Sequence, residues 1–228
     1  YKVDAIPFDD YFYSDKGAKG KTSGAFTILN ETDQDTYINY TNSHNESKFD
    51  KDNALNKAEW RRLQVDLLIE ELHAAISNYN KNEKSFVQLG ISPTGIYKNG
   101  DGVVTYDENN NAVTDGSRTN GQTHYSSYLF CDTVKWINNG WIDYILPQSY
   151  WADDNKDAQY QNVMGWWDKV VKYKKVNLYS GIGLYMSDSD KQTYGWQSND
   201  FQFYSQLNYI AGSENILGAS IYNFNTLR

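Results

Sequence analysis

The sequence predicts an α/β fold built on a parallel sheet, and three observations lead to this prediction. Five short apolar runs rich in β-branched and aromatic residues recur along the chain, helical patterns separate them, and long polar connections follow two of them. Strands that alternate with helices are typical of βαβ units. The expected strands cover residues 3–8, 86–92, 142–150, 176–185 and 216–224.

The clearest expected helix covers residues 60–77. Its apolar residues recur at helical spacing, which places one face of the helix against the sheet. These residues are Leu63, Leu67, Leu68, Leu72, Ala75 and Ile76. Three more helices are expected over residues 125–138, 162–173 and 198–211.

Two connections are long for βαβ units, residues 14–58 and residues 98–123. Both follow a strand, so we expect them on the rim at the carboxyl ends of the strands. Loops of this length are usually functional or disordered. Within the second, residues 103–106 and 112–114 can pair as a hairpin.

No metal or other cofactor is expected. Asp107, Asn109 and Asn111 alternate like the start of a calcium loop, but Ala112 and Arg118 stand where an EF-hand has Gly and Glu. The three histidines lack the spacing of zinc ligands. Cys131 is the only cysteine, which excludes an intramolecular disulfide, and its apolar neighbours indicate a small buried hydrophobe in a helix.

Composition narrows the class of partner. The 228 residues suffice for one core, so a single domain is expected. A net charge of −8 without a Lys or Arg block opposes binding to nucleic acid or to an anionic membrane. The 20 Tyr and 7 Trp suit stacking on sugar rings, although Tyr is also common at protein interfaces. The sequence contains no apolar run long enough for a membrane span, and any export signal would lie upstream of Tyr1.

The first strand ends in two adjacent carboxylates, Asp9 and Asp10, followed by Tyr11. The odd positions of this strand are small and lead up to Asp9, so strand alternation directs Asp9 into a barrel or crevice. Catalytic groups of α/β folds gather at the carboxyl ends of parallel strands. The alternative is a pair of exposed turn aspartates.

Several motifs, in order, resemble those of the glycosyl hydrolase-like 10 family, with a more distant similarity to family 18 chitinases. They span nearly the whole chain. They read VDAIPFDDYFY (3–13), EWRR (59–62), LGISPTGIYKN (89–99), GWIDYILPQSYW (140–151), GWW (165–167), LYSGIGLY (178–185) and GAS (218–220).

The resemblance implies a (β/α)8 barrel of the TIM type that hydrolyses a bacterial surface polysaccharide outside the cytoplasm, with peptidoglycan glycan strands the best guess. In the family pattern about three β/α units precede the Asp-Asp-Tyr strand, so residues 1–228 would form one N-terminally incomplete barrel domain of strands four to eight. Five strands cannot close such a barrel. The exposed edge of the first strand must then be covered, and self-association is one way to cover it.

Glycoside cleavage usually needs two carboxylates, one of which protonates the leaving oxygen. Asp9 is the expected acid, while Asp10 either holds Asp9 protonated by repulsion or orients a loop. No Glu follows any other strand. The second group is therefore an N-acetyl group of the substrate, a group outside the chain, or one of Asp153, Asp154, Asp188 and Asp190.

Substrate binding is assigned to polar and aromatic residues near the strand ends. Gln148 and Tyr150 share one strand face, so both would reach the mouth of a barrel, and Trp151 is placed to stack on a sugar. Tyr97 and Asn99 are expected to line the cleft. Tyr11, Tyr185 and Tyr222 complete the set. The alternative functions are a non-catalytic carbohydrate-binding protein and an inactive barrel fragment.

Overall fold

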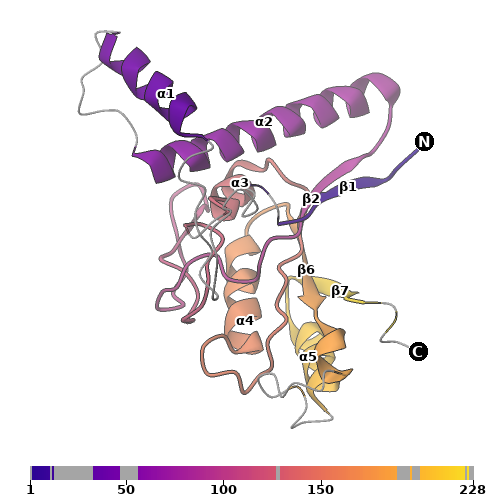
Figure 1. The fold of residues 1–228 in the computed structure, drawn as a ribbon. Coiled ribbons are helices and arrows are strands. Elements are labelled where there is room, and N and C mark those ends of the chain that lie inside the picture. Colours follow the sequence, from indigo (N-terminus) through magenta and orange to yellow (C-terminus); the bar gives the residue numbers. More distant parts are fainter. Residues whose placement is uncertain are drawn as a thin grey trace.

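The computed structural model describes residues 2–10, 12, 33–46, 56–126, 129–188, 196, 201–223 and 225, without the side chains of residues 44–46 and 188. Strands and helices alternate along the chain (Figure 1). The elements are β1 (Ala5–Phe8), α1 (Gln34–Glu46), α2 (Lys57–Glu83), β2 (Gln88–Ile91), β3 (Thr105–Tyr106), β4 (Ala112–Val113), α3 (Thr133–Asn139), β5 (Tyr144–Ile145), α4 (Tyr160–Val171), β6 (Asn177–Ile182), a 3-10 turn (Leu184–Asp188), α5 (Gln202–Gly212) and β7 (Ile216–Ile221).

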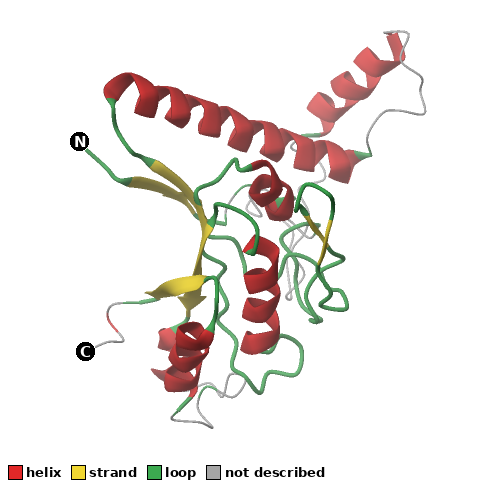
Figure 2. Cartoon of the chain, turned by 180° about the vertical axis from the view of Figure 1, so that it is seen from behind, coloured by secondary structure: helices red, strands yellow, loops and turns green. Residues whose placement is uncertain are grey.

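The main sheet confirms the predicted parallel arrangement. Its five strands lie in the order β1-β2-β5-β6-β7, and every pair is parallel. Helices α2 to α5 lie on one side of the sheet, and no helix of the described residues covers the other side (Figures 1 and 2). A doubly wound sheet carries helices on both faces, whereas a barrel wall carries them on the outside. In the described residues β1 and β7 remain the two edges of an open sheet.

The core lies between the central strands and the helices α3 and α4. Leu89, Ile145 and Leu178 from three neighbouring strands are fully buried, as are the rings of Trp136 and Trp167. Each indole N–H has a partner: Trp136 donates to Asp66 Oδ1 over 2.6 Å and Trp167 to the Gly95 carbonyl over 2.8 Å. These bonds remove the penalty for burying a polar N–H.

The third predicted strand is much shorter than residues 142–150. β5 covers only Tyr144–Ile145, because Pro147 has no N–H to donate to a continuing ladder. The extended chain nevertheless continues, with isolated parallel bridges from Gln148 to Thr94 and to Gly181. Burial alternates strictly from residue 144 to residue 150, so the predicted face that carries Gln148 is confirmed.

Two helices, α2 and α3, differ most from those expected. α2 is longer than residues 60–77, because Asn56 and Glu59 form a capping box at its start and Lys84 adopts a left-handed conformation at its end. The helix expected over residues 125–138 begins only at Thr133, where Asp132 caps it. Cys131 is buried as expected but precedes the helix, and its thiol donates to the Leu129 carbonyl over 3.2 Å.

The two long connections contain regular structure. α1 occupies part of residues 14–58, and Asp33 just before it accepts two hydrogen bonds from Arg61 of α2, at 2.7 and 2.8 Å. Within residues 98–123 the expected hairpin is confirmed as the antiparallel pair β3 and β4. Asp107, considered above as a calcium ligand, caps the hairpin turn by accepting the N–H groups of Asn109 and Asn111.

A helix that crosses a membrane needs about 20 consecutive, mostly apolar residues. Even α2, the longest described helix, lacks an apolar stretch sufficient to cross the bilayer, and this holds for every helix in the described ranges.

Candidate active site

A cavity of about 490 Å³ lies at the carboxyl ends of the strands of the main sheet. All five strands contribute to it, either directly or through the residues that follow them. The lining residues are Pro7, Phe8, Asp9, Asp10, Ser92, Leu146, Gln148, Tyr150, Gly181, Ser220, Ile221 and Tyr222. Because the strands are parallel, residues that are far apart in the sequence meet at this end.

Asp9 is held by two N–H donors. Its Oδ1 accepts the Asp10 backbone N–H over 2.9 Å and the Gln148 side-chain amide over 2.9 Å. The same Gln148 Nε2 donates to the Ser92 carbonyl over 3.0 Å. Gln148 therefore connects the ends of β1 and β2, and both of these hydrogen bonds to Asp9 are made at Oδ1.

Close backbone packing brings Gln148 to this place. A side chain at Gly181 would meet the Pro147 carbonyl oxygen at 2.9 Å and the Gln148 Cα at 3.1 Å. A side chain at Gly183 would meet the Tyr150 ring at 2.8 Å. The two glycines of β6 and its extension thus allow the chain after β5 to approach the cavity.

Three tyrosines pack together beside the carboxylates. The Tyr150 and Tyr222 rings are stacked at a centroid distance of 6.2 Å, and the Tyr185 ring meets both edge-on at 6.1 and 5.7 Å. Burial raises the pKa of Tyr150, and the neighbouring Tyr185 and the Asp9 charge raise it further. The Tyr150 hydroxyl thus keeps its proton and can donate a hydrogen bond.

Asp9 and Asp10 are the only carboxylates that line the cavity among the described residues. Of the other candidates, Asp153 accepts a hydrogen bond from Ser205 of α5 over 2.8 Å, and neither Asp153 nor the exposed Asp154 lines the cavity. The Asp188 side chain and Asp190 lie outside the described part of the chain.

Several residues that the sequence assigned to the substrate lie elsewhere. Tyr97 is buried in the core, where its hydroxyl donates to Asp132 over 2.8 Å. Asn99 donates to the Gly121 carbonyl over 2.8 Å within the second long connection. The half-buried Trp151 ring lies beside Gly95 and packs against the core. None of these three residues lines the cavity, and each side chain has a structural partner elsewhere.

The remaining assigned residues divide as follows. Asp9, Asp10, Gln148, Tyr150 and Tyr222 come together in the cavity, and Tyr185 contacts two of its tyrosines. Tyr11 lies outside the described residues.

Sequence reasoning missed the hydrogen bond between Asp9 and Gln148 and the role of the Ser92 carbonyl. The sequence pattern carries no signal for a hydrogen bond between two side chains that are 139 positions apart. The small residues Ser92, Gly181 and Ser220, which the strand ends carry, were the available indication that the chain leaves space there.

The sequence of the chain also matches known proteins. The profile of the family described as "Glycosyl hydrolase-like 10" matches residues 1–198. The chain is 32% identical over 200 residues to "Glycosyl hydrolase DigH" of Escherichia coli K12, which covers 87% of this chain and 38% of that protein. It is 33% identical over 187 residues to "Glycosyl hydrolase YngK" of Bacillus subtilis, covering 81% and 30% respectively.

The chain therefore spans 30–38% of the length of these curated relatives. The matched residues include β1 with its two carboxylates and the Gln148 segment, so the match covers most of the cavity described above. On the strength of a profile match over 198 of its 228 residues, the chain belongs to the glycosyl hydrolase-like 10 family.

Proposed function

We propose that this protein is a glycoside hydrolase in which Asp9 is the general acid. The observation that carries the proposal is the carboxylate at the end of β1, fixed at Oδ1 by Gln148 beside a cluster of three tyrosines. An acid must protonate the leaving oxygen as the glycosidic bond breaks. Asp9 Oδ2 supplies this proton, and Tyr150 and Tyr222 hold the sugar by ring contact and hydroxyl donation.

We further propose that the substrate supplies the second reacting group. Among the described cavity residues Asp10 is the only carboxylate besides Asp9, and it directly follows Asp9 in the chain, so no carboxylate from another strand end faces Asp9 across the cavity. An N-acetyl group of the sugar can act as the nucleophile where a second carboxylate is missing. This favours an N-acetylated glycan, and among bacterial surface polysaccharides the glycan strands of peptidoglycan fit best. Such a substrate places the enzyme outside the cytoplasm.

The fold that would carry this site is the last five β/α units of a (β/α)8 barrel. Support comes from the single helix-covered side of the parallel sheet and from the cavity at the carboxyl ends of the strands, where barrel enzymes have their active sites. Self-association through β1 would not involve this cavity, because it concerns the opposite end of the strand.

A second candidate function is glycan binding without turnover. The absence of a further carboxylate among the described cavity residues favours this candidate. An inactive fragment would neither bind nor cleave the glycan. Measuring binding and reducing-end release on the same substrate distinguishes both alternatives from catalysis.

The experiment compares denuded peptidoglycan with the same material after de-N-acetylation. We expect release of reducing ends from the N-acetylated glycan, and at least about a hundredfold less from the de-N-acetylated one, since the internal nucleophile is removed. Equal rates on both would contradict substrate assistance. Binding without release from either would favour the carbohydrate-binding alternative, and neither binding nor release would indicate an inactive fragment.

A further inference from the structure

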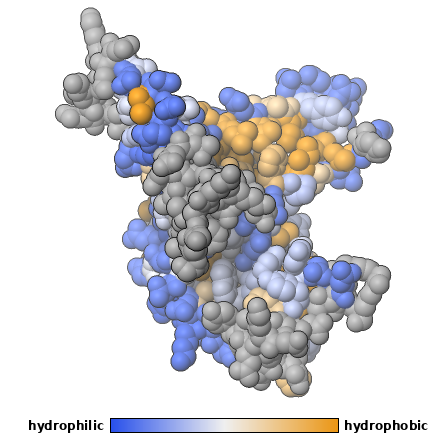
Figure 3. Space-filling model, viewed as in Figure 1, coloured by the Kyte–Doolittle hydropathy of each residue, from blue (hydrophilic) through white to orange (hydrophobic). Residues whose placement is uncertain are grey.

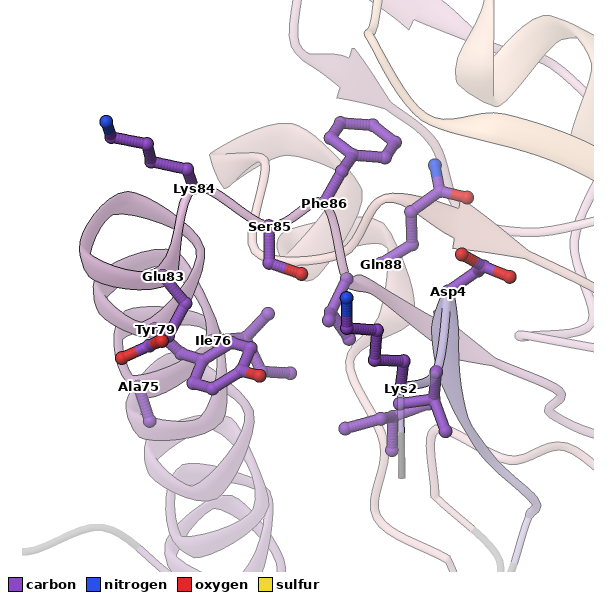
Figure 4. A pocket seen from close by; sticks show the side chains of 13 residues that line it. Lys2, Asp4, Ala75, Ile76, Tyr79, Glu83, Lys84, Ser85, Phe86 and Gln88 are labelled. Atoms are coloured by element: carbon purple, nitrogen blue, oxygen red, sulfur yellow. The ribbon is translucent and has the colours of Figure 1, made fainter.

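An apolar cleft of about 790 Å³ opens near the amino end of β1, between this strand and the C-terminal half of α2 (Figure 4). Apolar surface also gathers along the middle of α2 (Figure 3). The cleft and the candidate active site lie at opposite ends of β1 and share no lining residue. Side chains of α5, in contrast, hydrogen-bond to the segment that leads out of the active-site cavity. The residues of α5 are therefore better placed than those of the cleft to act on the site.

Tyr150 and Trp151 begin this segment, and both of their backbone carbonyls accept a hydrogen bond from a side chain. The buried Trp196 indole donates to the Tyr150 carbonyl over 2.8 Å. Gln206 Nε2, from the middle of α5, donates to the Trp151 carbonyl over 3.0 Å. Two consecutive peptide groups next to the cavity are thus held by side chains from a later part of the chain.

Gln206 is completely buried, yet its amide uses only part of its hydrogen-bonding capacity. Its Nε2 donates to Trp151, whereas its Oε1 accepts no hydrogen bond from the described residues. A hydrogen bond gained inside a protein adds little net stability, and a buried polar atom without a partner costs a comparable amount. The net contribution of Gln206 to stability is therefore small, and this points away from a purely structural role.

We propose that Gln206 is a positioning residue, which holds the Trp151 carbonyl and so fixes where the preceding Tyr150 ring stands in the cavity. The inference rests on the function proposed above and adds a residue that serves it. Tyr150 stacks on Tyr222 at a centroid distance of 6.2 Å and lines the cavity together with Asp9. A shift of its backbone would move the ring that holds the sugar relative to the acid, and a misplacement of about 1 Å can cost about a hundredfold in rate.

Gln202 offers a matched comparison on the same helix. It lies one turn before Gln206, so both side chains share a face of α5. Gln202 is also buried, with 2% exposure, but its Nε2 donates to no acceptor in the described ranges. The two glutamines therefore differ in the one feature that matters here, the hydrogen bond to the Trp151 carbonyl.

Gln206→Met and Gln202→Met remove the same amide and keep a flexible side chain of similar length. With denuded peptidoglycan as substrate, we expect Gln206→Met to lower kcat at least about tenfold and to change KM by less than about twofold. The reason is that the glycan still meets the tyrosine rings but is less well oriented towards Asp9. Gln202→Met should retain kcat and KM.

The melting temperature of Gln206→Met should stay near that of the unmodified protein, because the substitution removes a hydrogen bond and an unpaired buried oxygen together. A fall of kcat that is matched by a fall of the melting temperature would indicate a structural role and overturn the proposal. Equal losses of kcat in Gln206→Met and Gln202→Met would overturn it as well.

The position of the Tyr150 ring can also be followed without turnover. In protein labelled with 13C on its tyrosine rings, the Tyr150 signal is identified by its loss in Tyr150→Phe. We expect this signal to shift in Gln206→Met and to stay in place in Gln202→Met. An unmoved signal in Gln206→Met would overturn the positioning role. A shifted signal in a protein that releases no reducing ends would support the positioning role and contradict the proposed function, so the two failures are distinguishable.

Discussion

β1 and β2 lie side by side in parallel register, yet only β2 is buried. Ile6 of β1 is paired with Leu89 of β2, but Ile6 is 38% exposed while Leu89 is completely inaccessible. The two strands have similarly apolar sequences, and the difference comes from their neighbours. β2 has a strand on each side, whereas β1 forms the edge of the sheet. Apolar pattern therefore predicts that a strand exists, while its neighbours decide how deeply it is buried.

Both strands nevertheless end at the same cavity. Asp9 follows the exposed strand β1 and Ser92 follows the buried strand β2, and Gln148 donates to both. The candidate acid thus follows β1, the more exposed strand of the pair, and is held in place by Gln148, which follows the central strand β5.

The largest expected effect is the loss of stability when the buried member of the pair is truncated. Leu89→Ala leaves a cavity in the core and should lower the free energy of unfolding by about 2–5 kcal/mol. Ile6→Ala should cost less than about 1.5 kcal/mol, because Ile6 already contacts solvent. Urea unfolding of both variants measures the difference, and equal losses would show that β1 is covered in solution.

The buried layer should also respond to acid. Burial lowers the pKa of His124 to about 3, below the value of about 6.5 expected in the unfolded chain. The unfolded state therefore binds a proton that the folded state refuses, and stability present above pH of about 6.5 is lost progressively as the pH falls toward 3.

Urea unfolding at a series of pH values, for the unmodified protein and for His124→Gln, checks this. The unmodified protein should lose stability more steeply below neutral pH. His124 accepts or donates hydrogen bonds at both ring nitrogens, with Thr94 and Thr133, so the variant is compared by its slope with pH and not by its absolute stability. Parallel slopes for the two proteins would contradict a neutral buried His124.

The smallest expected effect concerns the link between the two strands. Gln148→Leu removes the donor to Asp9 and to Ser92 while keeping a side chain of similar size. We expect kcat for glycan hydrolysis to fall by about tenfold, since Asp9 is less well oriented. The melting temperature of Gln148→Leu should stay near that of the unmodified protein, and unchanged kcat would mean that Gln148 does not position Asp9.

Much of the fold could be predicted because it depends on local patterns. The alternation of residues 144–150 is visible in the sequence and reappears as burial. The helical spacing predicted α2 but the wrong buried face: Leu67 and Leu68 are 42% and 45% exposed, whereas Trp60, Arg61, Val65, Asp66 and Ile69 are buried. Boundaries were missed where one residue decides them, as Pro147 does for β5 and Asp132 for α3.

The site could be predicted only in part, for a similar reason. Asp9, Gln148 and Tyr150 were predicted to lie together because they follow strands of a parallel sheet, whose carboxyl ends meet at one edge. Tyr97 and Trp151 do not line the cavity, since an aromatic ring near a strand end can turn either to the cavity or to the core, and only tertiary packing decides.

The central claim is that Asp9 performs the chemistry at the carboxyl end of β1, and a pair of substitutions on this strand tests it most directly. Asp9→Asn changes the carboxylate in the cavity, and Asp4→Asn changes an exposed carboxylate at the other end of the strand. The measurement is the initial rate of reducing-end release from denuded peptidoglycan.

We expect Asp9→Asn to abolish release, or to reduce it by at least about a hundredfold, with an unchanged melting temperature because Asp9 is exposed. Asp4→Asn should retain the full rate. Full activity of Asp9→Asn, or equal losses in the two variants, would contradict the assignment of Asp9 as the catalytic acid.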